Sequence, residues 1–291
     1  MKHLSRHEVP VPVANGLPGR RARFLPENAG AGPEVSASGI VPSHDRPEGR
    51  YRLGRVPAPD RVLVGTSGYN YPEWRGSFYP EKLSTTGMLA FYAERFRTVE
   101  INYTFYRIPT EKLLAGWAAG TPDGFIFTLK APRRITHDAK LQRCEDLLQT
   151  FCRTARTLGP KLGVLLFQLP PSFRKQADVL RAFVNLIPDG TRAAFEFRHA
   201  SWLDGEVYDI LRERELALCI ADSEKLSTPV EATASYAYFR LRDEGYQDGD
   251  LQRWAATVRD LPGPETAYVY FKHEEQGLGP EFARRFSAHL T

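Results

Sequence analysis

Residues 162–197 read LGVLLFQLPPSFRKQADVLRAFVNLIPDGTRAAFEF, and this stretch decides the fold. It opens with an apolar run at residues 162–168, continues with helical apolar spacing near 179–187, and closes with a second run at 192–197. Compact strand-helix-strand units are typical of parallel strands, because a right-handed crossover helix returns the chain to the same edge of the sheet. The stretch therefore predicts part of a parallel α/β sheet.

The same alternation continues on both sides of this stretch. Further strands are expected at residues 61–66, 99–103, 125–130, 216–221, 236–241 and 267–271. Helices are expected behind them near residues 88–96, 113–118, 141–158, 207–214, 251–258 and 282–290. The stretch after Asp222, which holds Ser227-Thr228-Pro229, shows no clear helix. Eight units predict one α/β domain over residues 59–291, a closed TIM-type (β/α)8 barrel with a degenerate sixth unit.

An open doubly wound sheet would alternate in the same way. Such sheets usually carry a phosphate-binding glycine loop after the first strand. Here Gly65-Thr66-Ser67-Gly68 does not match that loop, and a Walker A motif is absent. The sequence therefore favours the barrel and predicts no nucleotide cofactor.

The net charge of +4 belongs to the N-terminal part of the chain. Residues 1–58 are rich in Pro, Gly, Ala and Arg and lack a sustained apolar period, so they predict a disordered extension. Residues 1–59 hold nine Lys or Arg and five Asp or Glu, which accounts for the whole net charge. The barrel is then neutral overall, and a basic footprint for nucleic acid would have to be local.

Three cysteines, Cys144, Cys152 and Cys219, form no CxxC or Cys/His pattern, which favours a reduced, cytoplasmic setting. No run approaches the roughly 18 apolar residues of a membrane span. The first residues also lack the apolar core of a signal peptide. We therefore expect a soluble cytoplasmic protein with no membrane partner, and the sequence leaves its oligomeric state open.

Polar side chains stand at the ends of most of the predicted strands. They are Glu100, Asn102, Lys130, Gln168, Glu196, Arg198, Asp222, Arg240, Lys272 and His273. The carboxyl ends of barrel strands meet at one mouth, where the chemistry of this fold takes place. Alternation also puts Glu100 and Asn102 on one side of their strand, and Glu196 and Arg198 on one side of theirs. We therefore expect a mixed-charge pocket at this mouth.

The residue types in this pocket suggest an anionic ligand. The cations suited to a phosphate or carboxylate are Lys130, Arg198, Arg240 and Lys272. The other candidate substrate contacts are Tyr69, Asn102 and Gln168. The candidate general acids or bases are Glu100, Glu196 and Asp222.

Two alternatives limit this interpretation. Structural ion pairs look like catalytic groups in a sequence, so the same residues could form a mutually satisfied network that only closes the top of the barrel. A Schiff-base role for Lys130 is disfavoured, because a lysine near Glu100 and Glu196 is expected to be charged and paired.

A divalent metal is a further open alternative. Its ligands would come from Glu100, Glu196 and Asp222 together with His137, His199 and His273, which no short ligand motif connects. The ordinary role of His137 and His199 is to cap or hydrogen-bond the loops in which they lie.

The loop over residues 67–86 is too long for a mere connector. Its aromatic residues are Tyr69, Tyr71, Trp74, Phe78 and Tyr79. They could stack on a base or a sugar, as aromatics do in single-strand binders. The alternative, favoured for Trp74 and Phe78, is a hydrophobic cluster that pins the loop over the barrel.

Five motifs in order carry a resemblance to a known family. They are Gly65-Thr66-Ser67-Gly68-Tyr69, Glu100-Ile101-Asn102-Tyr103-Thr104-Phe105-Tyr106, Lys130-Ala131-Pro132-Arg133-Arg134-Ile135-Thr136-His137, Leu165-Leu166-Phe167-Gln168-Leu169-Pro170-Pro171-Ser172-Phe173 and Glu196-Phe197-Arg198-His199-Ala200-Ser201-Trp202. On these motifs the chain resembles the YecE-like domain-of-unknown-function family (DUF72). The resemblance implies a TIM-type barrel and no particular reaction. The chain departs from the family pattern at Tyr69, where many members have Trp, and at Lys272-His273-Glu274, where many have Asn-Asn-Asp.

The leading hypothesis is an enzyme that acts on an anionic, phosphate-bearing small molecule or nucleic-acid component at the barrel mouth. Its chemistry would be acid-base or metal-assisted. The alternative is a non-catalytic nucleic-acid-binding or regulatory module that uses Lys130, Arg133 and Arg134 with the loop aromatics. A third hypothesis is a structural protein with a vestigial pocket.

Overall fold

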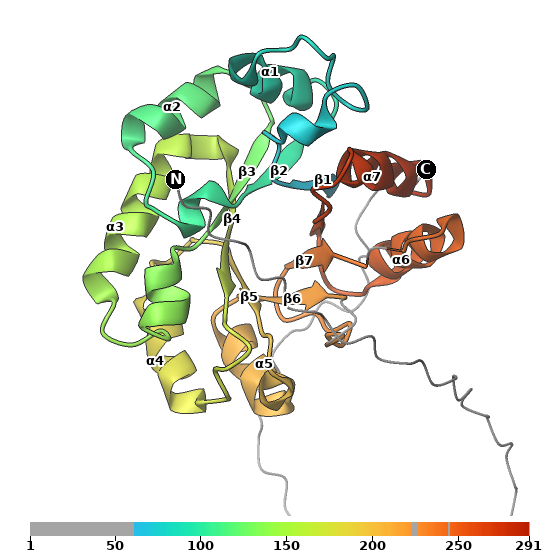
Figure 1. The fold of residues 1–291 in the computed structure, drawn as a ribbon. Helices are drawn as coiled ribbons and strands as arrows, with labels where there is room; N and C mark the ends of the chain where they lie inside the picture. Colours follow the sequence, from blue (N-terminus) through green and yellow to red (C-terminus); the bar gives the residue numbers. More distant parts are fainter. Residues whose placement is uncertain (1–60, 223–225, 244, 291) are drawn as a thin grey trace, which may run out of the picture. The chain divides into compact units, whose positions relative to one another are not determined.

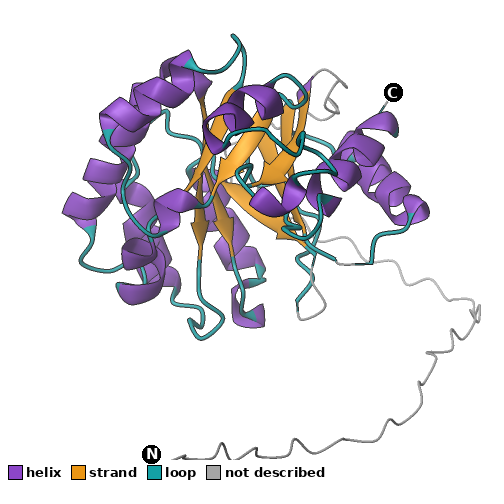
Figure 2. Ribbon diagram, turned by 45° about the horizontal axis from the view of Figure 1, so that its top comes forward, coloured by secondary structure: helices purple, strands orange, loops and turns teal. Residues whose placement is uncertain are grey.

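Eight parallel strands close into a barrel that is surrounded by helices (Figures 1 and 2). The computed structural model describes residues 61–222, 226–243 and 245–290. The extension predicted for residues 1–58 lies outside the described residues. Each strand pairs with its neighbours in the chain, and the first strand pairs with the last, so the predicted closed barrel is confirmed.

The strands begin and end close to the expected residues. They are β1 (Val62–Ser67), β2 (Thr98–Ile101), β3 (Ile126–Lys130), β4 (Leu162–Gln168), β5 (Ala193–Glu196), β6 (Ala217–Ala221), β7 (Tyr236–Leu241) and β8 (Thr266–Phe271). The register places Ser67 beside Glu100 and Gln168 beside Glu196. Polar strand ends therefore meet at the same level of the barrel. Gly65 allows β1 to approach β2, because a Cβ atom there would lie 2.1 Å from the carbonyl oxygen of Thr98.

The helices lie around the outside of the barrel, as Figure 2 shows. They are α1 (Met88–Ala93), α2 (Glu111–Ala119), α3 (Glu145–Ala155), α4 (Ala177–Leu186), α5 (Gly205–Glu213), α6 (Asp248–Asp260) and α7 (Leu278–Ala288). The side chains of Thr110 and Asp204 cap α2 and α5 by accepting backbone N–H bonds. Residues 226–235, the described part of the connection between β6 and β7 after Asp222, form no helix, which confirms the degenerate sixth unit.

The strands separate two apolar layers. Outward-facing strand residues pack against the helices, and a second cluster fills the barrel interior. The inner cluster consists of Leu63, Val164, Leu166, Ala194, Ala217, Cys219, Ala221, Tyr236, Tyr238, Tyr268 and Tyr270. Small residues on β5 and β6 leave room for the four tyrosines of β7 and β8. The tyrosine hydroxyl groups need partners at this depth, and that of Tyr270 bonds to Thr98 and Thr128.

Two predicted elements end or begin differently in the structure. The second strand was expected to reach residue 103, but it ends at Ile101 because Asn102 takes a helical conformation and starts a 3-10 turn. The third helix was expected from residue 141, but it begins at Glu145. A π-helical turn at Arg134–Asp138 occupies the preceding loop instead. Among the described residues, no helix is both long enough and apolar enough to cross a membrane.

Candidate functional site

A buried ion network forms the floor of the barrel mouth. Arg240, near the end of β7, is fully buried and lies between two buried carboxylates. Its Nη2 atom is 2.8 Å from Oε1 of Glu100 on β2, and its Nη1 atom pairs with Oε2 of Glu196 on β5. The network therefore connects three strands across the barrel interior.

Further donors saturate both carboxylates. Glu100 also accepts hydrogen bonds from the hydroxyl groups of Ser67 and Tyr238. Glu196 also accepts from Nε2 of Gln168 at 2.8 Å and from Nη1 of Arg242 at 3.2 Å. Each carboxylate thus has three hydrogen-bond donors, including Arg240. This part of the site matches the alternative of a mutually satisfied ion network, except that the buried Nε of Arg240 has no hydrogen-bond partner in the described residues.

The electrostatics of the floor keep Glu196 ionised. Burial raises the pKa of this carboxyl group, but Arg240, Arg242 and the Gln168 amide outweigh burial and bring the pKa down to about 2. Burial lowers the pKa of Arg240, yet the charges of Glu100 and Glu196 reverse that effect and raise the pKa well above its ordinary value. The ion pair therefore stays charged across the physiological pH range.

Lys130 is a buried cation of the mouth that takes no part in the ion pairs of this network. Its side chain is 8% exposed at the end of β3, and its Nζ lies 4.3 Å from the centre of the Phe105 ring. No carboxylate in the described part of the chain lies within ion-pair distance of Nζ, since the nearby glutamates are held by Arg240. Burial and the charge of Arg240 lower the pKa of Lys130 to about 8. The expectation of a paired lysine is therefore wrong.

Other cations surround the mouth above the floor. Arg198 is partly exposed, with its Nε 3.9 Å from Oε1 of Glu196. Lys272 is also partly exposed and lies 3.3 Å from the carboxylate of Glu274. Five cations, Lys130, Arg198, Arg240, Arg242 and Lys272, thus face three carboxylates, Glu100, Glu196 and Glu274. The mouth therefore has an excess of positive charge, and the excess is larger when Lys130 is protonated.

The other predicted contact residues lie at different depths. Asn102 donates to Oγ of Ser67 at 2.9 Å and so belongs to the edge of the network. Tyr69 lines a shallow hollow of about 330 Å³ with Asn102 and Tyr103.

Asp222 lies apart from the two glutamates, because its carboxylate accepts from the backbone N–H of Arg242 and from the hydroxyl of Tyr246. Its neighbours include residues of α6, outside the barrel.

The three histidines do not converge. Nδ1 of His199 accepts the backbone N–H of Ser201, and Nε2 of His273 bonds to the carbonyl of Asp243. His137 packs against the Phe105 ring at 5.0 Å, on the side of the mouth near Lys130. In the parts of the chain that the structure describes, no group of three or more His, Cys, Asp or Glu residues comes together as a metal site.

Three residues of the site were not among those predicted from the sequence. Ser67, Tyr238 and Arg242 all bond to the floor carboxylates. Alternation along the strand could have found two of them, since residues 238, 240 and 242 lie two apart and point to the same side. Ser67 follows from the register of β1 beside Glu100.

The aromatic loop after β1 is fastened to the barrel. Trp74 and Tyr79 are buried, and Trp74 stacks on Tyr79 and contacts Phe78 edge to face. The indole N–H of Trp74 donates to the carbonyl of Glu274 at 2.9 Å, which ties this loop to the one after β8. These side chains are therefore a packed cluster rather than a stacking surface.

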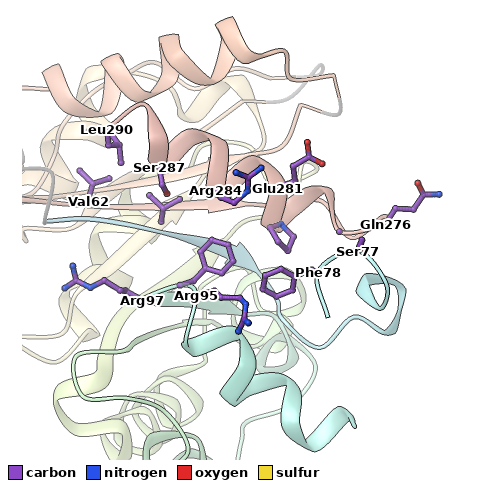
Figure 3. A pocket seen from close by; sticks show the side chains of 14 residues that line it. Val62, Ser77, Phe78, Arg95, Arg97, Gln276, Glu281, Arg284, Ser287 and Leu290 are labelled. Atoms are coloured by element: carbon purple, nitrogen blue, oxygen red, sulfur yellow. The ribbon is translucent and has the colours of Figure 1, made fainter. Parts of the chain in front are cut away.

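A hollow of about 860 Å³ lies on the outer side of the barrel wall, between β1 and α7 (Figure 3). Outward-facing Val62 and Val64 form its base, and Arg95, Arg97 and Arg284 are among its lining residues. None of the polar strand-end residues lines it. It is therefore separate from the mouth.

Comparisons with known proteins agree with this fold. A family model described as "Protein of unknown function DUF72" matches residues 63–291. The protein described as UPF0759 protein YecE from Escherichia coli (strain K12) is 31% identical over 249 residues, covering 76% of this chain and 89% of its own. The protein described as UPF0759 protein YunF from Bacillus subtilis (strain 168) is 27% identical, over 51% of this chain and 54% of its own.

Solved structures show the same architecture. The crystal structure of a DUF72 family protein from Thermotoga maritima has 28% sequence identity and a TM-score of 0.69, over 79% of this chain and 98% of its own. A DUF72 family protein from Enterococcus faecalis has a TM-score of 0.67 at 18% identity, over 79% of this chain and 95% of its own, and it supports the fold alone.

Proposed function

Because the chain belongs to the DUF72 family, whose description assigns no reaction, we propose a function from the geometry of the mouth. The mouth binds a small anionic molecule that carries a phosphate or carboxylate group, and it transforms this molecule by acid-base chemistry. The observation that carries the proposal is Lys130, a buried cation with no carboxylate beside it in the described residues.

A buried ammonium group without a counter-charge is costly, because it loses its hydration without gaining an ion pair. An anionic ligand would supply the missing charge. Arg198 and Arg242 both approach Oε1 of Glu196 and offer guanidinium groups, which suit the two oxygens of a phosphate or carboxylate. The excess positive charge of the mouth also attracts such a ligand from solution.

The glutamates in the floor of the mouth are poor candidates for proton transfer. Glu196 has a pKa of about 2 and already accepts hydrogen bonds from Gln168, Arg240 and Arg242, so it is neither a good acid nor a free base. His137 is a better candidate. Burial, followed by the charges of Lys130, Arg133 and Arg198, lowers the pKa of its ring, so the ring is neutral at pH 7 and can accept a proton.

The direct test is ligand binding to the full chain. Isothermal titration with inorganic phosphate, and with small sugar phosphates and carboxylates, should give saturable binding that Lys130→Met abolishes. Lys112→Met is the matched control, because Lys112 is exposed on α2. Equal binding by wild type and Lys130→Met, or no binding at all, would contradict the proposal. Native mass spectrometry and elemental analysis of freshly purified protein would identify any metabolite or divalent metal that accompanies it.

A second candidate function has its own observation. Tyr103 and Tyr106 are exposed, the latter at 77%, and the guanidinium of Arg107 lies 4.6 Å from the Tyr103 ring. Arg133 and Arg134 are exposed in the neighbouring loop. This surface suits single-stranded nucleic acid, in which bases stack on aromatic rings. Binding that weakens steeply with salt and that an Arg133→Ala/Arg134→Ala variant reduces would favour it over the small-molecule site.

A further inference from the structure

We propose that Lys130 is a nucleophilic amine, which forms a Schiff base with an aldehyde or ketone that also carries a phosphate or carboxylate group. The inference rests on the proposed anion site, and it names the substrate class of that site. The anionic group would bind the arginines of the mouth, and the carbonyl carbon would meet Nζ of Lys130.

The position of Lys130 suits this role. Its Nζ sits over the Phe105 ring, and in the described residues no protein group forms a hydrogen bond with it, so neither an acceptor nor a donor occupies the amine when it is neutral. Lys161 provides the contrast within the same chain. It is 9% exposed, but its Nζ donates to the carbonyls of Ala118 and Thr121 at 2.7 Å and to the Thr121 hydroxyl at 3.2 Å. Burial alone therefore does not distinguish Lys130, whereas its missing partner does.

The surroundings of Lys130 also increase the share of its neutral form, although the charged form still predominates at pH 7. A lysine becomes nucleophilic when it is desolvated or placed beside another cation. The groups that act on Lys130 are Glu100 from β2, Glu196 from β5, Arg240 from β7, Lys272 after β8, and His137 in the adjacent loop. Burial and Arg240 lower the pKa from 10.5 to about 8, against the opposing effect of the two glutamates. Near pH 7 this raises the fraction of free amine by about 300-fold.

The chemical step balances without a further reactant. The Nζ lone pair bonds to the carbonyl carbon, and the π electrons of the C=O bond move to oxygen. One proton passes from Nζ to that oxygen, and His137 is placed to relay it because its ring packs against the same Phe105 side chain. A second proton comes from solvent, the C–O bond breaks, and water leaves as nitrogen closes the iminium. Amine, carbonyl and one proton thus give iminium and water.

The experiment traps this iminium. The full chain is incubated near neutral pH with dihydroxyacetone phosphate or pyruvate, reduced with sodium borohydride, and analysed by intact mass and peptide mapping. Acetone serves as the uncharged control probe. We expect labelling of Lys130 to exceed that of Lys161 and of exposed Lys112 by more than about tenfold. Inorganic phosphate should suppress the labelling, and acetone should label Lys130 weakly.

A variant of Lys130 distinguishes the Schiff-base proposal from the proposal that the mouth binds an anion. Lys130→Arg keeps the charge, so it should still bind phosphate but should not be trapped. If phosphate binds and neither probe labels Lys130, the Schiff-base inference is overturned and the anion site stands. If phosphate does not bind, yet Lys130 is labelled equally by acetone and the anionic probes, the anion site is overturned. Labelling spread over lysines according to their exposure would overturn the inference as well, as would the absence of both binding and labelling.

Discussion

The guanidinium of Arg240 lies 2.8 Å from the carboxylate of Glu100, and both side chains are fully buried inside the barrel. Since Glu196 contacts the same guanidinium, one positive charge compensates two negative charges in the interior. Arg242 adds a second cation at 3.2 Å from Glu196. The network therefore depends on arginine at position 240 more than on any one of the acids.

Replacing Arg240 by Met should destabilise the fold severely. The variant leaves two buried carboxylates without their shared partner, which costs about 3–5 kcal/mol of unfolding free energy. Urea denaturation measures the loss. Arg181→Met is the matched control, because Arg181 pairs with Glu213 on the exposed surface and should lose less than about 1 kcal/mol. Equal losses in the two variants would show that the buried network contributes little.

Acid should destabilise the protein through Glu196. Its pKa is about 2 in the folded state, against an ordinary value of 4.5. Because the folded-state pKa is depressed, the stabilisation is present above pH 4.5 and is lost as the pH falls toward 2. The loss amounts to roughly 3 kcal/mol when complete. Chemical denaturation at a series of pH values should show this decline, and Glu196→Gln should flatten it. An unchanged slope in the variant would assign the decline to other carboxyl groups.

Anion affinity should depend on the protonation of Lys130. Sulfate is the suitable probe, because its own charge is constant over the neutral and alkaline range. Only the protonated lysine attracts it, so the dissociation constant should be flat below pH 8 and should rise by up to about tenfold per pH unit above it. Lys130→Arg should remove this dependence, since arginine stays charged. A wild-type profile as flat as that of the arginine variant would exclude Lys130 as the titrating group.

Lys130→Met should stabilise the empty protein although it removes the site. The methionine side chain fills a similar volume and needs no counter-charge, so we expect a gain of roughly 1–3 kcal/mol in unfolding free energy at pH 7. Thermal and urea denaturation without ligand measure it. Lys112→Met should stay within about 0.5 kcal/mol of wild type, as exposed substitutions usually do. A clear loss of stability in Lys130→Met would instead give the lysine a structural role.

Much of this architecture could be predicted because it follows from local patterns. The bounds of β4 and β7 match the apolar runs at residues 162–168 and 236–241. The lack of a helix in the described residues 226–235 was visible in the sequence as a break in periodicity. The gathering of Glu100, Lys130, Glu196 and Arg240 at one mouth follows from parallel strands alone. These features depend on the order of residues along the chain.

The pairing within the mouth could not be predicted in the same way. Arg240 was expected as a ligand-binding cation, and Lys130 was expected to pair with the glutamates. In the structure the longer, forked arginine reaches both Glu100 and Glu196, whereas the lysine forms an ion pair with neither. Asp222 follows the inward-facing Ala221 by one residue and so falls on the other side of its strand. The pairing and direction of these side chains depend on side-chain length and on the tilt of the strands. Neither property can be predicted from apolar periodicity.

The bond from Trp74 to Glu274 has a consequence for synthesis on the ribosome. It joins residues 200 positions apart, and the pairing of β1 with β8 closes the barrel at the same place. The ion pairs of Arg240 with Glu196 and Glu100 span 44 and 140 positions. A nascent chain that ends before β8 therefore exposes the edge of β1 and lacks the fastened loop, however well its earlier units have formed. The mouth is assembled late, when the last strand emerges and completes it.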